Sequence, residues 1–584
     1  MYSLFKKNQF FKCVIFLLGV AVFSSHPSVA EGSEEKSYYF KHNDWIDYIK
    51  IKDNKLCRRN NDCADVEFLD EGTTLKVKWE KYPIEIFELD STGKKWIFKG
   101  SKSFIQEEYE QFIYSLEEPY VKVNPYGSTP LSALVKFPTE EKTKISIRIK
   151  GRDGAPDIVH EFDGYKKEHE IPLVGLYSNY DNQVIIRATD EKGKSKKAQI
   201  TVTVGDSNLM AHWTPSVKKD KRFHYYSSTN GQIWDEEGHI RYIIEARGWH
   251  LTRFYKNDVY MEFKEGIVKY DLLGRELAYY PYPKGFYGYM HGMNFKDNGN
   301  LLVFGSYEDS KAIFDGREDV SHRDIVLEID AKTGVIVAQY DLAEMLNPDR
   351  ALIVKSAEED FGKVDWAHTN GIDYDSKNKA VIVSGRHFGI VKIDEASQKP
   401  IWWLTPHQLT HKSGRKGDKG DISHLLLTAV DKNGKPYPKA VQQGVEKAKG
   451  FKWPLKTHSV RYVGNGVYSI FDNSGNMYDK KLYTTKNSVA SVFKIDDKKK
   501  TVQQVFLKEL SEYSDMGSIV FVHPKTKEVW VFSSQAPVTH TSKMYNGIMR
   551  RFSDKGDLVY EAVLSRRDNG WDYSFQPFEF YSYE

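Results

Sequence analysis

The sequence is poor in cysteine, in net charge and in long apolar runs. Only 3 of its 584 residues are cysteine, and 84 Lys and Arg face 81 Asp and Glu, a formal net charge of +3. A near-neutral chain is a poor candidate for binding nucleic acid or an anionic membrane through bulk electrostatics. Helical periodicity is also rare, with residues 342–347 as a brief exception. These absences exclude a coiled coil and a charge-driven nucleic-acid binder, and the 14% aromatic content favours a sheet-rich core.

The first thirty residues have the three parts of a secretory signal. Lys6, Lys7 and Lys12 precede an apolar run at 13–23, and residues 28–30 end in the small side chains that cleavage requires. This run is too short to cross a bilayer of about 30 Å as a helix, and no later run approaches that length. A retained membrane anchor is the alternative. We expect an exported protein that has no membrane anchor once the signal is removed.

Two cysteines remain outside this signal. Cys57 and Cys63 bracket a short polar loop, and in an oxidising compartment this arrangement favours a disulfide between them. Their spacing does not fit a four-ligand zinc site, and no other cysteine exists to complete one.

The remaining chain is organised as strands in three stretches. Residues 31–118 form a polar, Lys/Glu-rich N-terminal extension of unknown role, with a possible strand at 74–79. Residues 119–205 are expected to form a small β-sandwich, and residues 206–584 a larger all-β unit. The strands expected in the sandwich lie at 131–137, 144–150, 182–190 and 198–204.

The larger unit is built from two recurring sequence patterns, here called phrases, each of which contains two strands. One is an alternating strand that ends near Asp, a turn and a second strand, with copies at 266–280, 324–342, 389–404, 491–507 and 547–564. The other precedes the later four copies, at 290–306, 367–385, 457–473 and 516–534. Each pair of phrases supplies the four strands of one propeller blade. We therefore predict an all-β chain with a six-bladed β-propeller after the β-sandwich, with five or seven blades as alternatives.

Three histidines share one place in the repeat. His291, His368 and His458 each open the first strand of their phrase, where the fourth copy has Gly517. The first strand of a propeller blade is innermost, so these imidazoles are expected to converge at one mouth of the central channel. Arg386 follows a second strand that returns to the same face, which predicts a pocket for a compact oxyanion. The alternatives are three structural histidines, or a zinc site that holds a water.

At these residues the sequence resembles the bacterial periplasmic aryl-sulfate sulfotransferases, which transfer sulfate between phenols without a nucleotide donor. The resemblance implies a β-sandwich and a six-bladed propeller in a periplasmic homodimer that acts on a phenolic sulfate donor and a phenolic acceptor, without a cofactor. The stretches that carry it are VNPYGSTPLSALV (123–135), PKGFYGYMH (283–291), DWAHTNGIDYD (365–375), SGRHFGIVKI (384–393), KTHSVRYVGNG (456–466) and IFDNSG (470–475).

The resemblance also implies roles for single residues. His458 would be the nucleophile that forms a sulfohistidine, and His291, His368, Asn370 and Arg386 would surround the sulfuryl group. Either His291 or His368 would serve as the acid and base for the aryl oxygens.

Two departures from the family pattern stand out. Where the family has a Thr hydroxyl, this sequence has Gly517 followed by Ser518, so whether Ser518 takes that role stays open. The family's cysteine pair in a propeller loop is missing, because residues 432–449 contain no Cys.

Other aromatic residues and histidines lie near these candidates in the sequence. Tyr287, Tyr289 and Trp366 flank the site histidines and are candidates to pack an aryl ring, although they fit ordinary core or rim aromatics equally well. Four further histidines lie in or beside polar stretches and are expected to be solvated: His387, His407, His411 and His424.

Competing functions leave different marks in the sequence. A formylglycine sulfatase needs C/S-x-P-x-R, but neither Cys57 nor Cys63 begins such a motif. A nucleotide-dependent sulfotransferase needs a phosphate loop, and no G-x-x-x-x-G-K-[ST] is present. Two alternatives stay open: a propeller that binds a glycan or protein without chemistry, and a metal-dependent propeller hydrolase.

Overall fold

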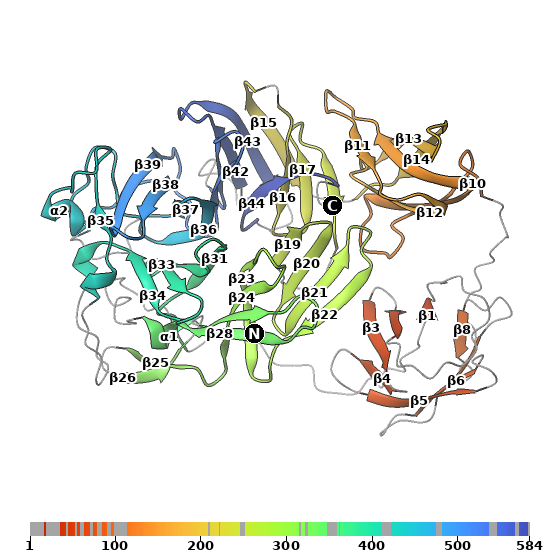
Figure 1. The fold of residues 1–584 in the computed structure, drawn as a ribbon, viewed down its shortest axis with the longest axis horizontal. Helices are drawn as coiled ribbons and strands as arrows, with labels where there is room; N and C mark the ends of the chain where they lie inside the picture. Colours follow the sequence, from red (N-terminus) through yellow and green to blue (C-terminus); the bar gives the residue numbers. More distant parts are fainter. Residues whose placement is uncertain are drawn as a thin grey trace. The chain divides into compact units, whose positions relative to one another are not determined.

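In the computed structural model, almost every described element is a β-strand (Figure 1). The structure describes strand backbones within residues 17–98 and then residues 114–581 with gaps at 208–210, 221, 246–250, 315–316, 322–324, 347–358, 361–362, 410–421, 475–481, 537–545 and 567–571. The chain divides into two compact units, Met1–Phe112 and Ile113–Glu584.

The first unit is one antiparallel meander, in which each strand from β2 to β8 pairs with the next and β1 pairs with β8. Its strands are β1 (Leu17–Leu18), β2 (Lys36–His42), β3 (Trp45–Lys52), β4 (Lys55–Arg58), β5 (Cys63–Leu69), β6 (Thr74–Lys78), β7 (Glu85–Leu89) and β8 (Lys95–Phe98). The strand expected at 74–79 is confirmed as β6, whereas the rest of the meander was not predicted. The register of β4 and β5 places Cys57 opposite Cys63. Cα atoms of such partners are about 4.5–5.5 Å apart, a separation that a disulfide can bridge.

The second unit begins with the sandwich, which consists of β9 (Tyr120–Val123), β10 (Ser132–Ile149), β11 (Ile158–Glu161), β12 (Lys166–Val174), β13 (Tyr180–Asp190) and β14 (Ser195–Val204). The strands predicted at 182–190 and 198–204 are confirmed. The segments predicted at 131–137 and 144–150 are confirmed as strand, but their separation is wrong, because both belong to β10. The first half of β10 pairs with β9 and β12, the second half pairs with β11 and β13, and the register shifts between Pro138 and Thr143. Proline lacks the N–H that a continuous ladder needs, so the irregularity falls in this segment.

Six further sheets follow, each with four or five strands. The first contains β16 (Tyr225–Ser228), β17 (Gln232–Asp235), β18 (Ile240–Ile243) and β44 (Phe575–Phe578), and the second contains β19 (Leu251–Tyr255), β20 (Asp258–Phe263), β21 (Gly266–Asp271) and β22 (Glu276–Pro281). The third contains β23 (Phe286–Phe295), β24 (Leu301–Tyr307), β27 (Ile325–Ile329) and β28 (Ile336–Asp341), and the fourth contains β31 (Thr369–Asp375), β32 (Ala380–Gly385), β33 (Gly389–Asp394) and β34 (Pro400–Leu404). The fifth contains β36 (Thr457–Gly464), β37 (Val467–Asp472), β38 (Val489–Asp496), β39 (Thr501–Glu509) and the short parallel strand β35 (Thr428–Ala429). The sixth contains β40 (Ile519–Val522), β41 (Val529–Ser533), β42 (Asn546–Phe552), β43 (Leu558–Arg566) and β15 (Ala211–Lys218).

These sheets confirm the prediction of an all-β chain with a propeller and the repeat behind it, whereas the number of blades stays a prediction. Each copy of the Asp-terminated phrase forms the two outer strands of a meander, such as β33 and β34. Each copy of the preceding phrase forms the two strands before them, such as β31 and β32. The alternation of apolar residues therefore located both the strands and their order.

The two ends of the propeller region are joined by strand pairing. The early strand β15 pairs with β43 near the C-terminus, and the last strand, β44, pairs with β16. The edge strands β19, β23, β31, β36 and β40 contact one another in that order. Side chains at the starts of these strands are thereby gathered from distant parts of the sequence.

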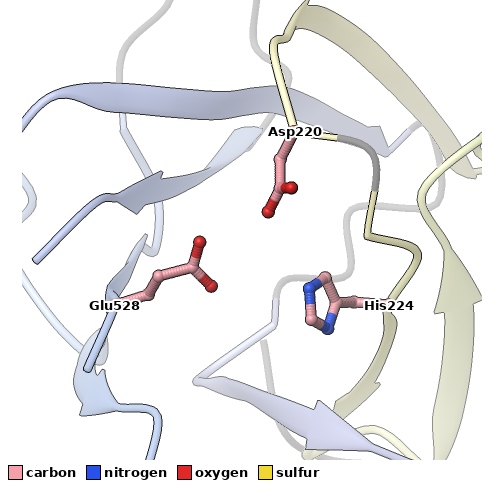
Figure 2. Close-up of side chains that lie close together, drawn as sticks. All are labelled: Asp220, His224 and Glu528. Atoms are coloured by element: carbon pink, nitrogen blue, oxygen red, sulfur yellow. The ribbon is translucent and has the colours of Figure 1, made fainter. Parts of the chain in front are cut away.

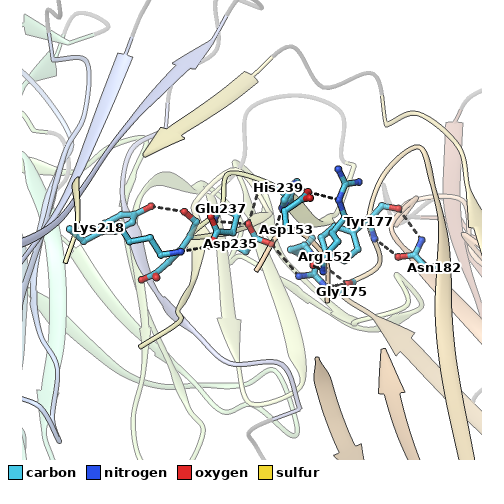
Figure 3. A network of polar contacts seen from close by, with 12 residues as sticks. Arg152, Asp153, Gly175, Tyr177, Asn182, Lys218, Asp235, Glu237 and His239 are labelled. Atoms are coloured by element: carbon cyan, nitrogen blue, oxygen red, sulfur yellow. Dashed lines mark hydrogen bonds and ion pairs between the residues drawn. The ribbon is translucent and has the colours of Figure 1, made fainter. Parts of the chain in front are cut away.

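A network of polar contacts joins the sandwich to the sheet of β16–β18 (Figure 3). The fully buried Arg241 donates two hydrogen bonds to the Gly175 carbonyl, through Nε at 3.0 Å and Nη2 at 2.6 Å, and a third to Asp235 at 3.2 Å. Its guanidinium lies 3.7 Å from the ring centre of Tyr177. These contacts hold the sandwich against the first propeller sheet.

The other described elements are short. They are the hairpins β25 (Lys311–Phe314) with β26 (Arg317–Val320) and β29 (Glu359–Asp360) with β30 (Lys363–Val364), the helices α1 (Leu342–Met345) and α2 (Lys439–Gln442), and the 3₁₀ turns His407–Leu409 and Ser423–Leu425. Helix α1 confirms the expected exception at 342–347, and Asp341 caps it. Within the described part of the chain, no helix is long and apolar enough to cross a membrane.

Candidate active site

Each of these six sheets contributes one polar or aromatic residue on or next to its edge strand. His368, Ser518 and Tyr573 precede β31, β40 and β44, and His458 is the second residue of β36. Arg253 lies within β19, and His291 lies in the middle of β23, where the register shifts between Gly288 and Met293, so the expectation that His291 opens its strand is wrong. The predicted convergence of the three histidines therefore rests on three edge strands that contact in sequence, β23, β31 and β36.

The rings of this group lie at contact distance. His291 and His368 meet edge to face, with ring centres 5.4 Å apart. Tyr573 lies 5.6 Å from His291 and 6.0 Å from His458. The aromatic ring of Tyr573 thus links the histidines of two different sheets.

Arg386 belongs to the same group, as the sequence predicted. It directly follows β32, and its backbone N–H donates to the His368 carbonyl at 3.0 Å. Arg386 is 8% exposed, and its charge lowers the pKa of His458. A largely buried guanidinium beside a neutral imidazole is suited to an oxyanion.

His458 is the most enclosed of the three histidines, at 1% exposure. Burial lowers its pKa well below the usual value, and the charges of Arg386 and Lys456 and the ring of His291 act in the same direction, whereas a hydrogen bond from the ring to Asn473 acts against them. Its Nδ1 has no hydrogen-bond partner among the described residues. His458 is therefore a neutral imidazole at neutral pH, and a neutral imidazole carries a lone pair on one of its nitrogens.

His368 is held by a buried carboxylate. Asp365 contacts Nδ1 of His368 through Oδ2, and it accepts the backbone N–H of His368 through Oδ1 at 3.1 Å. The backbone carbonyl of Asp365 accepts a hydrogen bond from His387 Nδ1 at 2.9 Å. A carboxylate on Nδ1 is the usual way to fix the tautomer of a working histidine.

The expectation that His387 is solvated is wrong. It is 3% exposed, and its ring centre lies 5.4 Å from that of His368. Its polar neighbours Ser384 and Arg386 are buried as well. Of the other three histidines, His424 is exposed, His407 is half-buried with Nε2 2.9 Å from the Leu427 carbonyl, and His411 lies outside the described residues.

Asn370 connects two edge strands. Its amide donates to the Thr457 carbonyl at 2.7 Å, and its Oδ1 accepts from Ser384 at 3.1 Å. Thr457 directly precedes His458, so Asn370 fixes the strand that carries this imidazole.

The backbone around the site is in an uncommon conformation. His368, Lys456, Ser459 and Ser518 have φ values of 45°, 47°, 54° and 82°. Residues with a side chain rarely occupy this left-handed region, and such outliers concentrate at functional sites. Asp365 holds the backbone of His368 in this conformation, and Asn370 binds the carbonyl of Thr457, which follows Lys456.

The remaining candidates lie in different surroundings. Ser518 is fully buried, and its hydroxyl contacts Ser514 Oγ at 2.8 Å and accepts the Ser534 N–H at 2.9 Å. Trp366 is fully buried in an apolar cluster and stacks on Phe388, as a core aromatic does. The half-buried ring of Tyr287 lies 5.9 Å from Lys264 Nζ, and the side chain of Tyr289 lies outside the described residues.

Comparison with known proteins decides the family. Residues 190–573 match the family described as "Arylsulfotransferase (ASST)", and residues 120–205 match "Arylsulfotransferase Ig-like domain". The chain belongs to the arylsulfotransferase family.

Curated relatives cover most of this arylsulfotransferase chain. One is "Arylsulfate sulfotransferase AssT" of Escherichia coli O6:H1 (strain CFT073), 25% identical over 506 residues, which are 70% of this chain and 81% of that protein. Another, of the same name, is from Lelliottia amnigena and is 23% identical over 565 residues, 78% of this chain and 91% of that protein. Among solved structures, the β-propeller domain of Myceliophthora thermophila Cps50 (Swd1) is 9% identical, over 60% of this chain and 95% of that one, with a TM-score of 0.28.

Sequence reasoning missed three site residues of this arylsulfotransferase. Asp365 stands three residues before His368 in the segment DWAH, and Lys456 stands two before His458 in the segment KTH. Both residues could have been found from their short distance in the sequence to a predicted site histidine. Lys456 is 2% exposed and contacts Asp515 and the Tyr513 hydroxyl. Tyr573 had no local signal, because β44 returns to the first sheet from the far end of the chain.

A separate cluster of possible metal ligands lies elsewhere in the arylsulfotransferase fold: Asp220, His224 and Glu528, here called the Asp220 cluster (Figure 2). One possible ligand atom from each of these three residues lies within 4.8 Å of the other two. Among the described residues, His291, His368 and His458 do not form a group of possible metal ligands at such distances. Arg222 Nη2 contacts Asp220 at 2.9 Å and Glu528 at 2.5 Å. These carboxylates are therefore already neutralised by an arginine.

Proposed function

We propose that the protein moves a sulfuryl group from a phenolic sulfate ester to a phenolic acceptor through a sulfohistidine at His458, without a nucleotide donor. Family membership and the names of the relatives support transfer from aryl sulfates. The observation that carries the mechanism is the buried imidazole of His458, which the charges of Arg386 and Lys456 help to keep neutral.

In the first half-reaction, a nitrogen of His458 attacks sulfur, the N–S bond forms and the bond from sulfur to the aryl oxygen breaks. Negative charge develops on the departing oxygen and remains on the sulfuryl oxygens. Arg386 is suited to hold those oxygens through charge-assisted hydrogen bonds in a site from which water is largely excluded. A Ser or Lys would need further activation to attack at neutral pH.

In the second half-reaction, a phenol takes the place of the first product. Its oxygen attacks the sulfur of sulfohistidine, the N–S bond breaks and the phenolic proton is lost. The two half-reactions use the same pocket in turn, so ping-pong kinetics are expected.

The setting of the reaction is part of the proposal. The signal-like first thirty residues support export to the periplasm, where the register of Cys57 and Cys63 supports a disulfide. The family resemblance supports a homodimer.

The decisive experiment is mass spectrometry of enzyme quenched during turnover with p-nitrophenyl sulfate and no acceptor. A sulfated peptide that contains His458, and that disappears when phenol is added, is the expected result. Turnover without any sulfated histidine would overturn the covalent mechanism and leave direct transfer.

A further inference from the structure

The side chain of Asp365 contacts both the ring and the backbone of His368. The carboxylate is 1% exposed, its Oδ2 contacts Nδ1 of the imidazole, and its Oδ1 accepts the backbone N–H of the same residue at 3.1 Å. The backbone carbonyl of Asp365 is in turn bonded to His387. Both the ring and the backbone of His368 are therefore fixed by one buried side chain.

This contact determines which nitrogen carries the proton. An ionised carboxylate only accepts hydrogen bonds, so the neutral ring must carry its proton on Nδ1. Nε2, on the far side of the ring, is then the nitrogen that can take up a proton. Once it has done so, the adjacent carboxylate stabilises the resulting imidazolium, as in other Asp–His pairs.

The position of the pair matches the needs of sulfate transfer. The His368 ring lies 5.4 Å from that of His291, and its carbonyl binds the N–H of Arg386, so the pair belongs to the same group of side chains as these two residues. His368 also has a φ of 45°, a conformation that the two contacts with Asp365 help to maintain.

We propose that Asp365 is a positioning residue that makes His368 the histidine which exchanges a proton with the aryl oxygen. The inference rests on the proposed function and adds to it a division of labour between His368 and the nucleophile His458.

The proton balance is closed over one cycle. As the N–S bond to His458 forms and the ester S–O bond breaks, protonated His368 gives its Nε2 proton to the departing phenoxide. When the acceptor phenol attacks, the new O–S bond forms, the N–S bond breaks, and His368 takes the phenolic proton. No other reactant is needed.

The test uses esters whose leaving groups differ in basicity. Nitrophenoxide departs readily without a proton, whereas phenoxide and alkylphenoxides need one. Asp365→Asn should lower kcat/KM only slightly with p-nitrophenyl sulfate and by about 10²–10⁴-fold with phenyl sulfate. A plot of log kcat/KM against leaving-group pKa should become steeper.

Asp341→Asn is the matched control. Asp341 caps α1 by accepting the N–H groups of Ala343 and Glu344 at 3.0 and 3.1 Å, so it undergoes the same chemical change in a purely structural role. This variant should keep the slope of the wild-type plot. An equal loss with every ester in Asp365→Asn would overturn the proposal, while a wild-type enzyme that transfers no sulfate would overturn the proposed function itself.

A second measurement covers the case in which Asp365→Asn does not fold. ¹⁵N shifts of labelled histidine in the wild-type protein report the tautomer, and His368→Gln identifies the signal. A neutral His368 with its proton on Nδ1 is expected. A proton on Nε2 in the neutral ring would overturn the proposal.

Discussion

Two polar clusters in the propeller each surround a histidine whose pKa lies well below the usual value. Burial is the largest cause in both. At His458 the charges of Arg386 and Lys456 add to it, and at His224 the charge of Arg551 does so. The two imidazoles are therefore neutral for closely similar reasons.

The two clusters differ in what the arginines contact. In the Asp220 cluster, Arg222 pairs with both Asp220 and Glu528, and Arg551 lies 3.7 and 3.9 Å from the same carboxylates. At the site, the carboxylates of Asp365 and Asp515 contact His368 and Lys456 instead, and the charge of Arg386 acts on neutral His458. The first arrangement is a self-neutralised ion-pair network, and the second is suited to an incoming anion.

The largest predicted effect tests whether His458 does chemistry. His458→Ala should lower p-nitrophenol release with phenol as acceptor by on the order of 10⁴-fold or more, because the covalent step is lost. His424→Ala removes an exposed histidine outside the site and should leave the rate unchanged. Circular dichroism should show intact sheets in both variants. Near-normal turnover of a folded His458→Ala enzyme would show that the neutral histidine of this cluster, like that of the Asp220 cluster, takes no part in the reaction.

The next effect concerns the guanidinium. Arg386→Ala should lower kcat by about 10²–10³-fold, as the loss of one preorganised oxyanion donor does. Arg386→Lys should restore only part, because an ammonium lacks the planar fork. Steady-state rates with p-nitrophenyl sulfate measure both. Full rescue by Lys would show that charge alone matters and that the fork geometry does not.

The sequence predicted what strand periodicity and repeats can encode. His291, His368 and His458 were found because equivalent positions in a repeat occupy equivalent positions in space, and Arg386 because a hairpin returns to its starting face. Tyr573 could not be found, because its strand joins a sheet formed some 350 residues earlier in the chain, at β16. The burial of His387 and the paired hydroxyl of Ser518 depend on tertiary packing, which overrides the local polarity that the sequence displays.

Ser518 gives a smaller effect, on stability and not on chemistry. Its hydroxyl accepts the Ser534 N–H and contacts Ser514, so Ser518→Ala should leave a buried N–H without its partner and lower the free energy of unfolding by about 1–3 kcal/mol. Urea unfolding measures this loss. The kcat should stay close to that of the wild type, and a loss comparable to that of Arg386→Ala would instead give Ser518 the family's Thr role.

The smallest effect lies in the Asp220 cluster and appears only in acid. Burial and the charge of Arg551 lower the pKa of His224 from 6.5 to about 3. Between these values the folded protein binds fewer protons at His224 than the unfolded chain does, so the free energy of unfolding falls as the pH drops from 6.5 toward 3. At about 1.4 kcal/mol per pH unit, this contribution reaches at most about 2 kcal/mol at pH 5. His224→Gln should remove it.

Urea unfolding at pH 7.5 and pH 5 measures this difference between the wild type and His224→Gln. The variant should lose less stability than the wild type on acidification, whereas His212→Gln, at an exposed position of β15, should follow the wild type. Sulfate transfer at pH 7.5 should be equal in all three proteins, because the carboxylates beside His224 are paired with arginines and the cluster stabilises the fold. A large loss of transfer in His224→Gln would place this second neutral imidazole in the chemistry and remove the distinction between the two clusters.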